Sequence, residues 1–241
     1  MKVVLKIDEI EYCADLSTGI DISIAVGKID EVSAYGIPKS EISIYKDGGF
    51  VGDVSSGGSC NVRNINMNPH GNGTHTECVG HVSKNYKTIY ETISDFHFAA
   101  TLISVNVEES IKAEDLAFLN ELPRTKGLII RTIPNTKAKL RANYSTETAV
   151  YIHPLAMQLI NELEYEHLIV DLPSVDHATD PILQSHKIYW ELEKDENSTK
   201  TITELVYIPN TITDGMYLVN LMLPSIYCDA VPSKPILYSL R

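Results

Sequence analysis

The sequence predicts an α/β fold, and three patterns carry this prediction. Residues 1–60 alternate short β-branched runs with Gly, Pro and Asp, a pattern typical of strands joined by turns. Residues 127–172 contain two apolar, strand-like runs that flank a segment with apolar residues at helical spacing. Strand-like runs return after residue 200. Strands that alternate with helices favour a sheet covered by helices.

The first half of the chain is expected to be mainly sheet. We expect N-terminal strands over residues 3–7, 21–25, 41–45 and 63–67. Residues 68–73 are rich in Gly, Asn and Pro, which predicts a loop. A longer strand is expected over 98–107. The leucines within 113–122 recur at helical spacing and Pro123 follows them, so we expect a helix there.

The second half is expected to alternate strands with helices. We expect strands over residues 127–133, 167–172, 201–208 and 216–223. Amphipathic helices are expected over 154–164 and 182–192. No long Gly/Ser/Pro-rich linker divides the chain, so we expect a single domain over residues 1–241.

The composition argues against several classes of partner. The chain has 241 residues, with 20 Lys and Arg against 32 Asp and Glu, and a formal net charge of −12. An acidic protein lacks the excess of basic side chains that nucleic acids and anionic membranes attract, so we expect neither as a partner. Apolar residues make up 44% of the sequence and charged residues 22%, which predicts a folded protein with a sizeable core.

The N-terminus and the cysteines favour a cytoplasmic location. The apolar run at the N-terminus is interrupted by Lys6 and Asp8, so we expect no secretory leader. No stretch of about 18 apolar residues is present, which argues against a membrane-spanning helix. The four cysteines are scattered and form no CxxC pair, a pattern that favours neither a disulfide framework nor a cysteine-rich zinc finger.

The strongest chemical signal is a cluster of potential metal ligands. Four such residues fall within twelve positions: His70, His75, Glu77 and His81. Neutral imidazole is the commonest metal ligand in proteins, and carboxylates complete many such sites. If residues 74–77 are extended, His75 and Glu77 point to the same face. Gly71 and Gly73 would let the preceding loop fold His70 back toward His75. We therefore expect a divalent-metal site.

Two other interpretations of this cluster stay open. The histidines can belong to a surface loop in which they only form hydrogen bonds. Alternatively, Cys78 can be a nucleophile with a nearby histidine as its base, which requires a lowered thiol pKa. A lone cysteine is more often a small apolar side chain, so the metal interpretation is favoured.

The same residues resemble the signature of a known family. Gly73-Thr74-His75-Thr76-Glu77, with His81 four residues later, resembles the HxGTHxDxPxH signature of the cyclase family, which includes bacterial-type kynurenine formamidases and isatin hydrolases. Later blocks of the family are resembled, in order, by residues 127–132, residues 170–176, His186 and residues 204–205. The resemblance covers roughly residues 60–210. It implies the swivelling β/β/α fold of that family.

The resemblance also implies roles for particular residues. It makes His75 and Glu77 metal ligands, with Glu77 in the position of an aspartate that can bridge two ions. His186 and Glu204 correspond to the distant histidine and glutamate that complete the metal site. His81 takes the position of the histidine that transfers protons. The implied cofactor is zinc or manganese, with one or two ions per chain.

The sequence departs from the family signature at three positions. Gly71 stands where the family has its first histidine, and His70 lies one residue earlier. We expect His70 to supply this ligand if the loop takes a different path. Glu77 replaces the aspartate, which lengthens the side chain by one methylene, and Val79 replaces a proline.

The function implied by the resemblance is metal-dependent hydrolysis of an amide C–N bond by activated water, with His81 as acid and base. The implied substrates are small molecules: an N-formyl arylamine such as N-formylkynurenine, as in tryptophan catabolism, or a cyclic amide. The implied enzyme is an arylformamidase-like homo-oligomer, such as a homodimer. The alternative is a non-catalytic member of the same fold that binds a metal or a small molecule.

Overall fold

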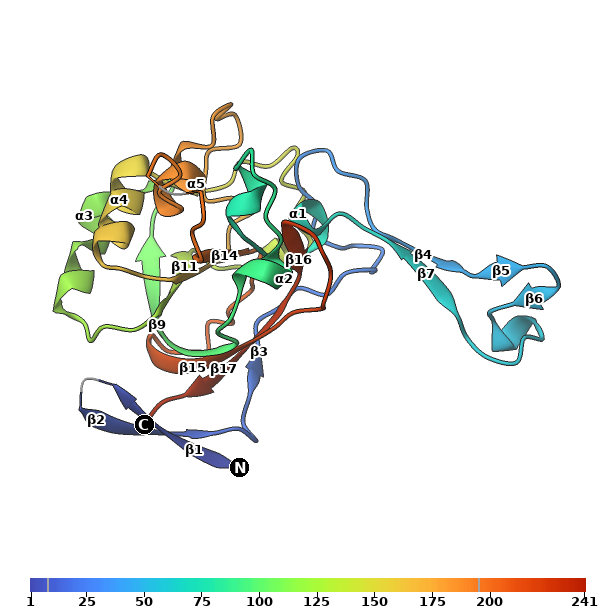
Figure 1. Ribbon diagram of the computed structural model, residues 1–241, viewed down its shortest axis with the longest axis horizontal. Coiled ribbons are helices and arrows are strands. Elements are labelled where there is room, and N and C mark those ends of the chain that lie inside the picture. Colours follow the sequence, from blue (N-terminus) through green and yellow to red (C-terminus); the bar gives the residue numbers. More distant parts are fainter. Residues whose placement is uncertain (8, 195) are drawn as a thin grey trace.

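The computed structural model describes residues 1–7, 9–194 and 196–241. A curled sheet of nine strands forms the body of the protein (Figure 1). From one edge to the other, the strands are β16 (Ala230–Pro232), β8 (His75–Glu77), β14 (Thr201–Glu204), β13 (His167–Val170), β11 (Gly127–Ile133), β9 (His97–Asn106), β15 (Gly215–Met222), β17 (Lys234–Ser239) and β3 (Ile20–Asp21). Together with the helices described next, this sheet confirms the α/β class expected from the sequence.

The centre of the sheet is parallel and its two ends are antiparallel. Strands β9, β11, β13 and β14 run in the same direction. Parallel neighbours need a crossover connection, and the crossovers here carry α3 (Ala113–Leu116), α4 (Pro154–Glu162) and α5 (Gln184–Tyr189). These helices lie on one side of the sheet (Figure 1).

The two faces of the sheet bury different apolar clusters. Leu128 and Ile130 of β11 pack in a cluster that includes Met157 of α4. Ile129, between them, packs on the other face with Val219 of β15, because successive side chains of a strand point to opposite faces. The run Leu128–Ile130 of β11 is therefore apolar without a break because both faces of the strand are covered.

Several predicted elements are present with shifted ends. The strands expected over 98–107, 127–133 and 216–223 correspond to β9, β11 and β15. The helix expected over 154–164 is α4, which starts at Pro154. The side chain of His153 caps this helix by accepting a hydrogen bond from the amide of Leu155.

The loop expected over residues 68–73 was predicted incorrectly. It contains a short helix, α1 (Pro69–Asn72). The Asn68 side chain accepts a hydrogen bond of 3.0 Å from the amide of His70, and Pro69 occupies the first helical position. Both are helix-start signals, so the Asn-Pro pair begins a helical turn here.

Two predicted strands and two predicted helices are much shorter than expected. Strand β3 ends at Asp21, whose carboxylate accepts a 2.9 Å hydrogen bond from the amide of Ser23 and starts a turn. Strand β14 ends at Glu204 because Leu205 has a φ of 54°. The helix expected over 113–122 divides into α3 and a 3₁₀ turn, η3 (Ala117–Glu121). The helix expected over 182–192 is reduced to α5.

Short elements connect the larger ones. They are η2 (Val79–His81), α2 (Ile89–Thr92), β10 (Ser110–Ile111), η4 (Lys137–Arg141) and β12 (Tyr151–Ile152).

Two hairpins extend from the body. The first pairs β1 (Lys2–Ile7) with β2 (Ile10–Asp15). The second, residues 41–66, is called the arm here, and it projects far from the sheet (Figure 1). The arm pairs β4 (Glu41–Ile44) with β7 (Arg63–Asn66) and carries β5 (Lys46–Asp47), β6 (Phe50–Val51) and η1 (Val54–Ser56) toward its tip. Its exposed apolar side chains are Ile42, Ile44, Tyr45, Phe50, Val54, Val62 and Ile65.

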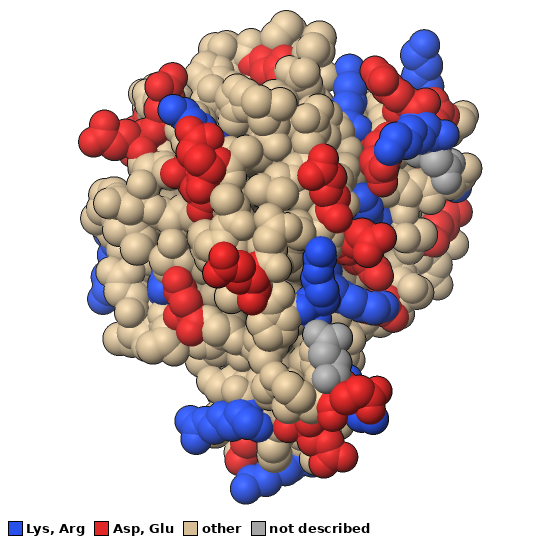
Figure 2. All heavy atoms as spheres, turned by 90° about the vertical axis from the view of Figure 1, so that its left-hand side faces the viewer, with Lys and Arg blue, Asp and Glu red and all other residues tan. Residues whose placement is uncertain are grey.

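The surface mixes charges of both signs. Figure 2 shows Lys and Arg side chains interspersed with Asp and Glu on the face that includes α3 and α4, with no continuous basic area there. Among the described residues, no helix combines the length and apolar character that crossing a membrane requires.

Candidate metal centre

Strand β8 places the first two candidate ligands. His75 and Glu77 are fully buried and lie on the same face of this strand, as the expected extended conformation requires. His75 pairs with Glu204 across the neighbouring strand β14. The Nε2 atom of His75 lies 3.4 Å from Oε2 of Glu204. The sheet therefore brings one distant predicted ligand to His75 directly.

The helical turn α1 places His70 in the same cluster. Its Nδ1 lies 3.2 Å from Oε2 of Glu77, and its ring centroid is 5.2 Å from that of His75. A Cβ atom at Gly71 would lie 2.7 Å from the Cβ of Ile37, so the turn has no room for a larger residue at that position. His70 therefore reaches the cluster in place of a histidine at position 71.

The 3₁₀ turn η2 places His81 beside His70. The two ring centroids are 4.3 Å apart, and Nδ1 of His81 lies 3.9 Å from Oε2 of Glu77. Gly80 makes this turn possible, because a Cβ there would lie 1.9 Å from the carbonyl oxygen of Lys87. His81 is more exposed than the buried ligands of β8, with 26% of its side chain accessible.

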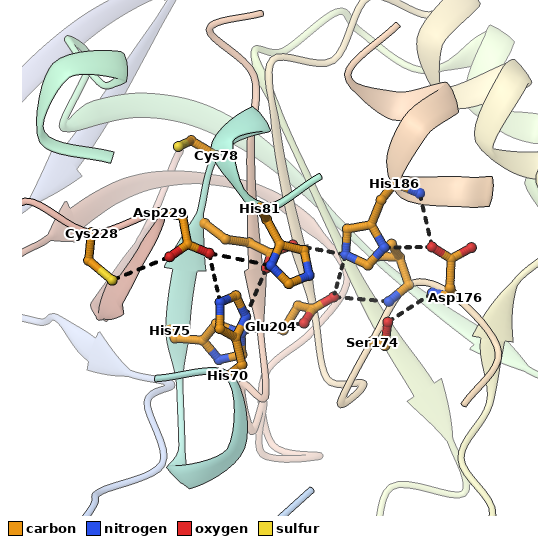
Figure 3. Close-up of polar contacts among 12 residues, drawn as sticks. His70, His75, Cys78, His81, Ser174, Asp176, His186, Glu204, Cys228 and Asp229 are labelled. Carbon is orange, nitrogen blue, oxygen red and sulfur yellow. Dashed lines mark hydrogen bonds and ion pairs between the residues drawn. The ribbon is translucent and has the colours of Figure 1, made fainter. Parts of the chain in front are cut away.

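His186 enters from α5 on the opposite side of the cluster. Its Nε2 lies 2.9 Å from Oε1 of Glu77 and 3.7 Å from Oε1 of Glu204. Its Nδ1 lies 2.5 Å from Oδ2 of Asp176. Asp176 also accepts hydrogen bonds from the backbone amides of Ser185 and His186. One carboxylate therefore fixes both the start of α5 and the direction of this imidazole (Figure 3).

Asp229 is a site residue that the sequence did not reveal. Its Oδ2 lies 3.0 Å from Nε2 of His70 and 3.4 Å from Nδ1 of His81. It lies in the segment before β16, about 150 positions from both histidines, with no motif around it. Only the pairing of β16 with β8 brings it to the cluster. Asp176 was equally unassigned, although it stands in a block that resembles the family.

Tyr35 brings the N-terminal segment to the edge of the site. Its hydroxyl donates a 2.7 Å hydrogen bond to the carbonyl of Pro173. Burial of the hydroxyl, and after it the charge of Glu204, raises the pKa of Tyr35. The phenol therefore stays protonated beside the carboxylates.

The buried donor atoms fit a metal ion. Nδ1 of His75 lies 3.0 Å from the carbonyl oxygen of Gly73, to which it can only donate, so its Nε2 carries a free lone pair. The amide of Val175 donates to Oε1 of Glu204 and orients that carboxylate. Nε2 of His75 and Oε2 of Glu77 are buried without a well-formed hydrogen bond to any described residue. Buried polar atoms are normally satisfied, and a cation at this point would satisfy both.

The donors form overlapping triplets. In each triplet the ligand atoms lie within 4.8 Å of one another. The triplets at this centre are His70–His75–Glu77, Glu77–His81–His186 and His70–His81–Asp229. Because His70, Glu77 and His81 are each shared between two triplets, the three triplets form one continuous group of donors.

Charges within the cluster reinforce one another. Burial alone would lower the pKa of His70 and His186, but their carboxylate partners outweigh it and raise each pKa to about 10. Burial likewise opposes ionisation of Glu77, yet His81 and His186 hold its pKa well below the usual range. The metal-free centre thus favours imidazolium and carboxylate, and a divalent cation would displace those protons.

Cys78 and His177 do not belong to this centre. The thiol of Cys78 lies in an apolar cluster with Ile89 and Val231 and contacts the carbonyl of Lys87 at 3.5 Å. Burial raises its pKa, which disfavours the thiolate that a nucleophile requires. His177 follows Asp176 in the sequence, but its ring contacts the side chain of Thr179.

Comparisons with known proteins agree with the fold described above. A family model for the cyclases matches residues 15–177. A predicted metal-dependent hydrolase from Bacillus stearothermophilus superposes with a TM-score of 0.67 at 15% identity, covering 92% of this chain and 98% of the other.

Two further solved structures are similar. A potential metal-dependent hydrolase with cyclase activity has a TM-score of 0.70 at 15% identity, covering 92% of this chain and 97% of the other. Isatin hydrolase A from Labrenzia aggregata has a TM-score of 0.68 at 14% identity, covering 91% of this chain and 93% of the other. A search of curated proteins finds no match.

Proposed function

This chain belongs to the cyclase family, and from that premise we propose that it is a metal-dependent hydrolase of amide C–N bonds. The proposed substrate is a small N-formyl arylamine, such as N-formylkynurenine, or a cyclic amide, such as isatin. The structural neighbours named for metal-dependent and isatin hydrolysis share the fold and so support this reaction class.

One observation carries the proposal: two buried ligand atoms of β8 have no well-formed hydrogen bond to any described residue. These are Nε2 of His75 and Oε2 of Glu77. Around them lie the other proposed ligands, His70, His186 and Glu204. Nitrogen and carboxylate donors of this kind suit zinc or manganese, with one or two ions per chain.

A divalent ion, when bound, supplies acidified water and a Lewis acid for the substrate carbonyl. The protein supplies the proton carrier. Nδ1 of His81 lies 3.4 Å from the carboxylate of Asp229, which is placed to accept a hydrogen bond from it and so to hold the ring. Nε2 of His81 then accepts a proton from the attacking water and returns it to the leaving nitrogen, so that amide and water become acid and amine.

The remaining residues orient the ligands. Asp176 holds Nδ1 of His186, so Nε2 of that ring faces Glu77. The carbonyl of Gly73 does the same for His75. Hydrogen-bonded partners of this kind fix the tautomer and direction of imidazole ligands and strengthen metal binding.

The proposal includes a homo-oligomer with a second copy seated on the arm. A two-stranded ribbon is marginally stable by itself in water, and this one exposes apolar side chains along its length. A second copy offers the same surface in return, as a two-fold interface requires.

The direct test is removal and restoration of the metal. Protein treated with chelator is reloaded with zinc or with manganese and assayed for hydrolysis of N-formylkynurenine and of isatin. We expect activity to disappear and to return with one of the ions, and alkylation of cysteines to leave it unchanged. Full activity in the metal-free protein would contradict the proposal.

A further inference from the structure

A second group of ligand-type side chains lies away from the metal centre, at the amino ends of the central strands. Asp95 precedes β9, and Glu166 and His167 stand at the start of β13. One ligand atom from each of these three residues lies within 4.8 Å of the others. The metal centre lies beyond the opposite end of β13, where Asp176 and Glu204 are placed. The two groups therefore share no residue.

His167 is the unusual member of this group. It is 4% exposed, and its ring stacks on Phe98 with centroids 3.9 Å apart. Its Nδ1 lies 2.8 Å from the hydroxyl of Thr201. Its Nε2 is buried and has no hydrogen-bond partner among the described residues. A buried polar atom without a partner is uncommon and calls for an explanation.

The protonation state of His167 suits a ligand. Burial lowers its pKa to about 4, so the imidazole is neutral at pH 7 and needs to lose no proton on binding a cation. This differs from His70 and His186, which the carboxylates of the metal centre keep protonated in the absence of an ion.

A cation already lies beside the two carboxylates. Nζ of Lys126 is 2.5 Å from Oδ2 of Asp95 and 3.5 Å from Oε2 of Glu166. All three side chains are about half exposed, and ion pairs of this kind contribute little to stability. Lys126 pairs with the two carboxylates, but Nε2 of His167 still has no hydrogen-bond partner among the described residues.

We propose that Asp95, Glu166 and His167 form a second divalent-cation site, of the zinc class, in which the ion displaces the ammonium of Lys126. Two carboxylates and one imidazole suit zinc and its neighbours, whereas magnesium and calcium prefer oxygen alone. With three protein ligands, water completes the coordination. The ion would tie the segment before β9 to the start of β13. This site does not depend on the hydrolase activity proposed above.

The test counts zinc ions per chain at saturation and measures their affinity by calorimetry. Asp95→Asn removes a half-exposed ligand with little change in shape, and Lys126→Gln removes the competing ammonium. The matched control is Asp21→Asn, because Asp21 pairs with Lys234 at the surface in the same way but has no histidine beside it. The readout is the difference between variants, so zinc held by the other centre cancels.

We expect Asp95→Asn to bind one zinc ion fewer per chain than the wild type, and Asp21→Asn to bind the same number. Lys126→Gln should bind the second ion up to about fivefold more tightly, since it loses only a surface ion pair. Cobalt should shift and broaden the NMR resonances of the His167 ring strongly in the wild type and much less in Asp95→Asn, in which only the distant metal centre can hold the ion. An unchanged zinc count in Asp95→Asn, or an equal loss in Asp21→Asn, would overturn the proposal.

Discussion

The imidazole of His70 reaches the metal centre from a position at which the cyclase signature has no histidine. The turn α1 makes this possible, because it brings Nδ1 of His70 to 3.2 Å from Glu77. Six residues of the centre could be predicted from the sequence, and the structure brings them together. They are His70, His75, Glu77, His81, His186 and Glu204. Their individual roles stay proposals.

His81 is the residue whose role can be separated most cleanly from metal binding. In His81→Ala we expect kcat to fall by about 10²- to 10⁴-fold, because a positioned acid and base contributes that much. Metal content should stay at the wild-type value, since the other ligands remain. Steady-state kinetics and elemental analysis on the same sample check both points. Loss of the ion together with activity would make His81 a ligand instead.

The two protonated histidines predict opposite pH dependences for the Tm of the metal-free protein and for the gain in Tm when zinc binds. The pKa of His70 and His186 is raised from 6.5 to about 10 on folding, so their contribution to stability is complete below pH 6.5 and is lost as the pH rises toward 10. In chelator, Tm should fall between pH 7 and 10. The gain in Tm from added zinc should grow over the same range, because ligand imidazoles must lose their protons.

Calorimetry with and without zinc across this pH range measures both trends. His70→Gln should show a smaller fall in chelator than the wild type. A metal-free Tm that does not change between pH 7 and 10 would contradict the assignment of these protonated imidazoles.

At the scale of elements, glycines decide where the histidines point. Gly80 allows η2 to pass within contact of Lys87, and Gly71 allows α1 to pack on Ile37. Local signals predicted elements such as α4 and β11, because their periodicity reflects burial on one or two faces. The same signals missed α1 and predicted a strand at β14 that is too long. A single helical turn depends on its cap and the end of a strand on a φ value, and the spacing of apolar residues indicates neither.

Moving the histidine to the family position tests the role of α1. In the double variant His70→Gly/Gly71→His, the new side chain meets Ile37, with a Cβ contact of 2.7 Å. We expect a loss of about 1–3 kcal/mol in the free energy of unfolding from overpacking. Denaturant unfolding in chelator measures it. Adding Ile37→Ala should recover part of the loss, and a double variant as stable as the wild type would contradict this explanation.

At the scale of the whole molecule, the curled sheet joins distant segments into one centre. Strand β8 lies between β14 and β16, which come about 125 and 155 residues later in the chain. That pairing places Glu204 and Asp229 beside the histidines. The family resemblance indicated Glu204, but no local pattern indicated Asp229, because the contact arises only from the order of strands in the sheet.

The arm predicts the oligomeric state. Ile42 and Ile65 face each other across its two strands and are 50% and 67% exposed. We expect light scattering to show a dimer for the wild type and a monomer for Ile42→Ser/Ile65→Ser, with the metal centre intact. The control is Ser43→Ala/Asn64→Ala, on the other face of the same strands, which should remain dimeric. A wild-type monomer would contradict the proposed interface.

The most direct test of the central claim is tightly bound metal per chain, measured after dialysis against metal-free buffer together with amide hydrolysis. The wild type and His177→Ala, a histidine outside the cluster, should each keep at least one ion and hydrolyse N-formylkynurenine or isatin. His75→Ala should lose both the ion and the activity, because it removes the buried nitrogen that no described residue satisfies. Retention of metal and turnover in His75→Ala would contradict the account.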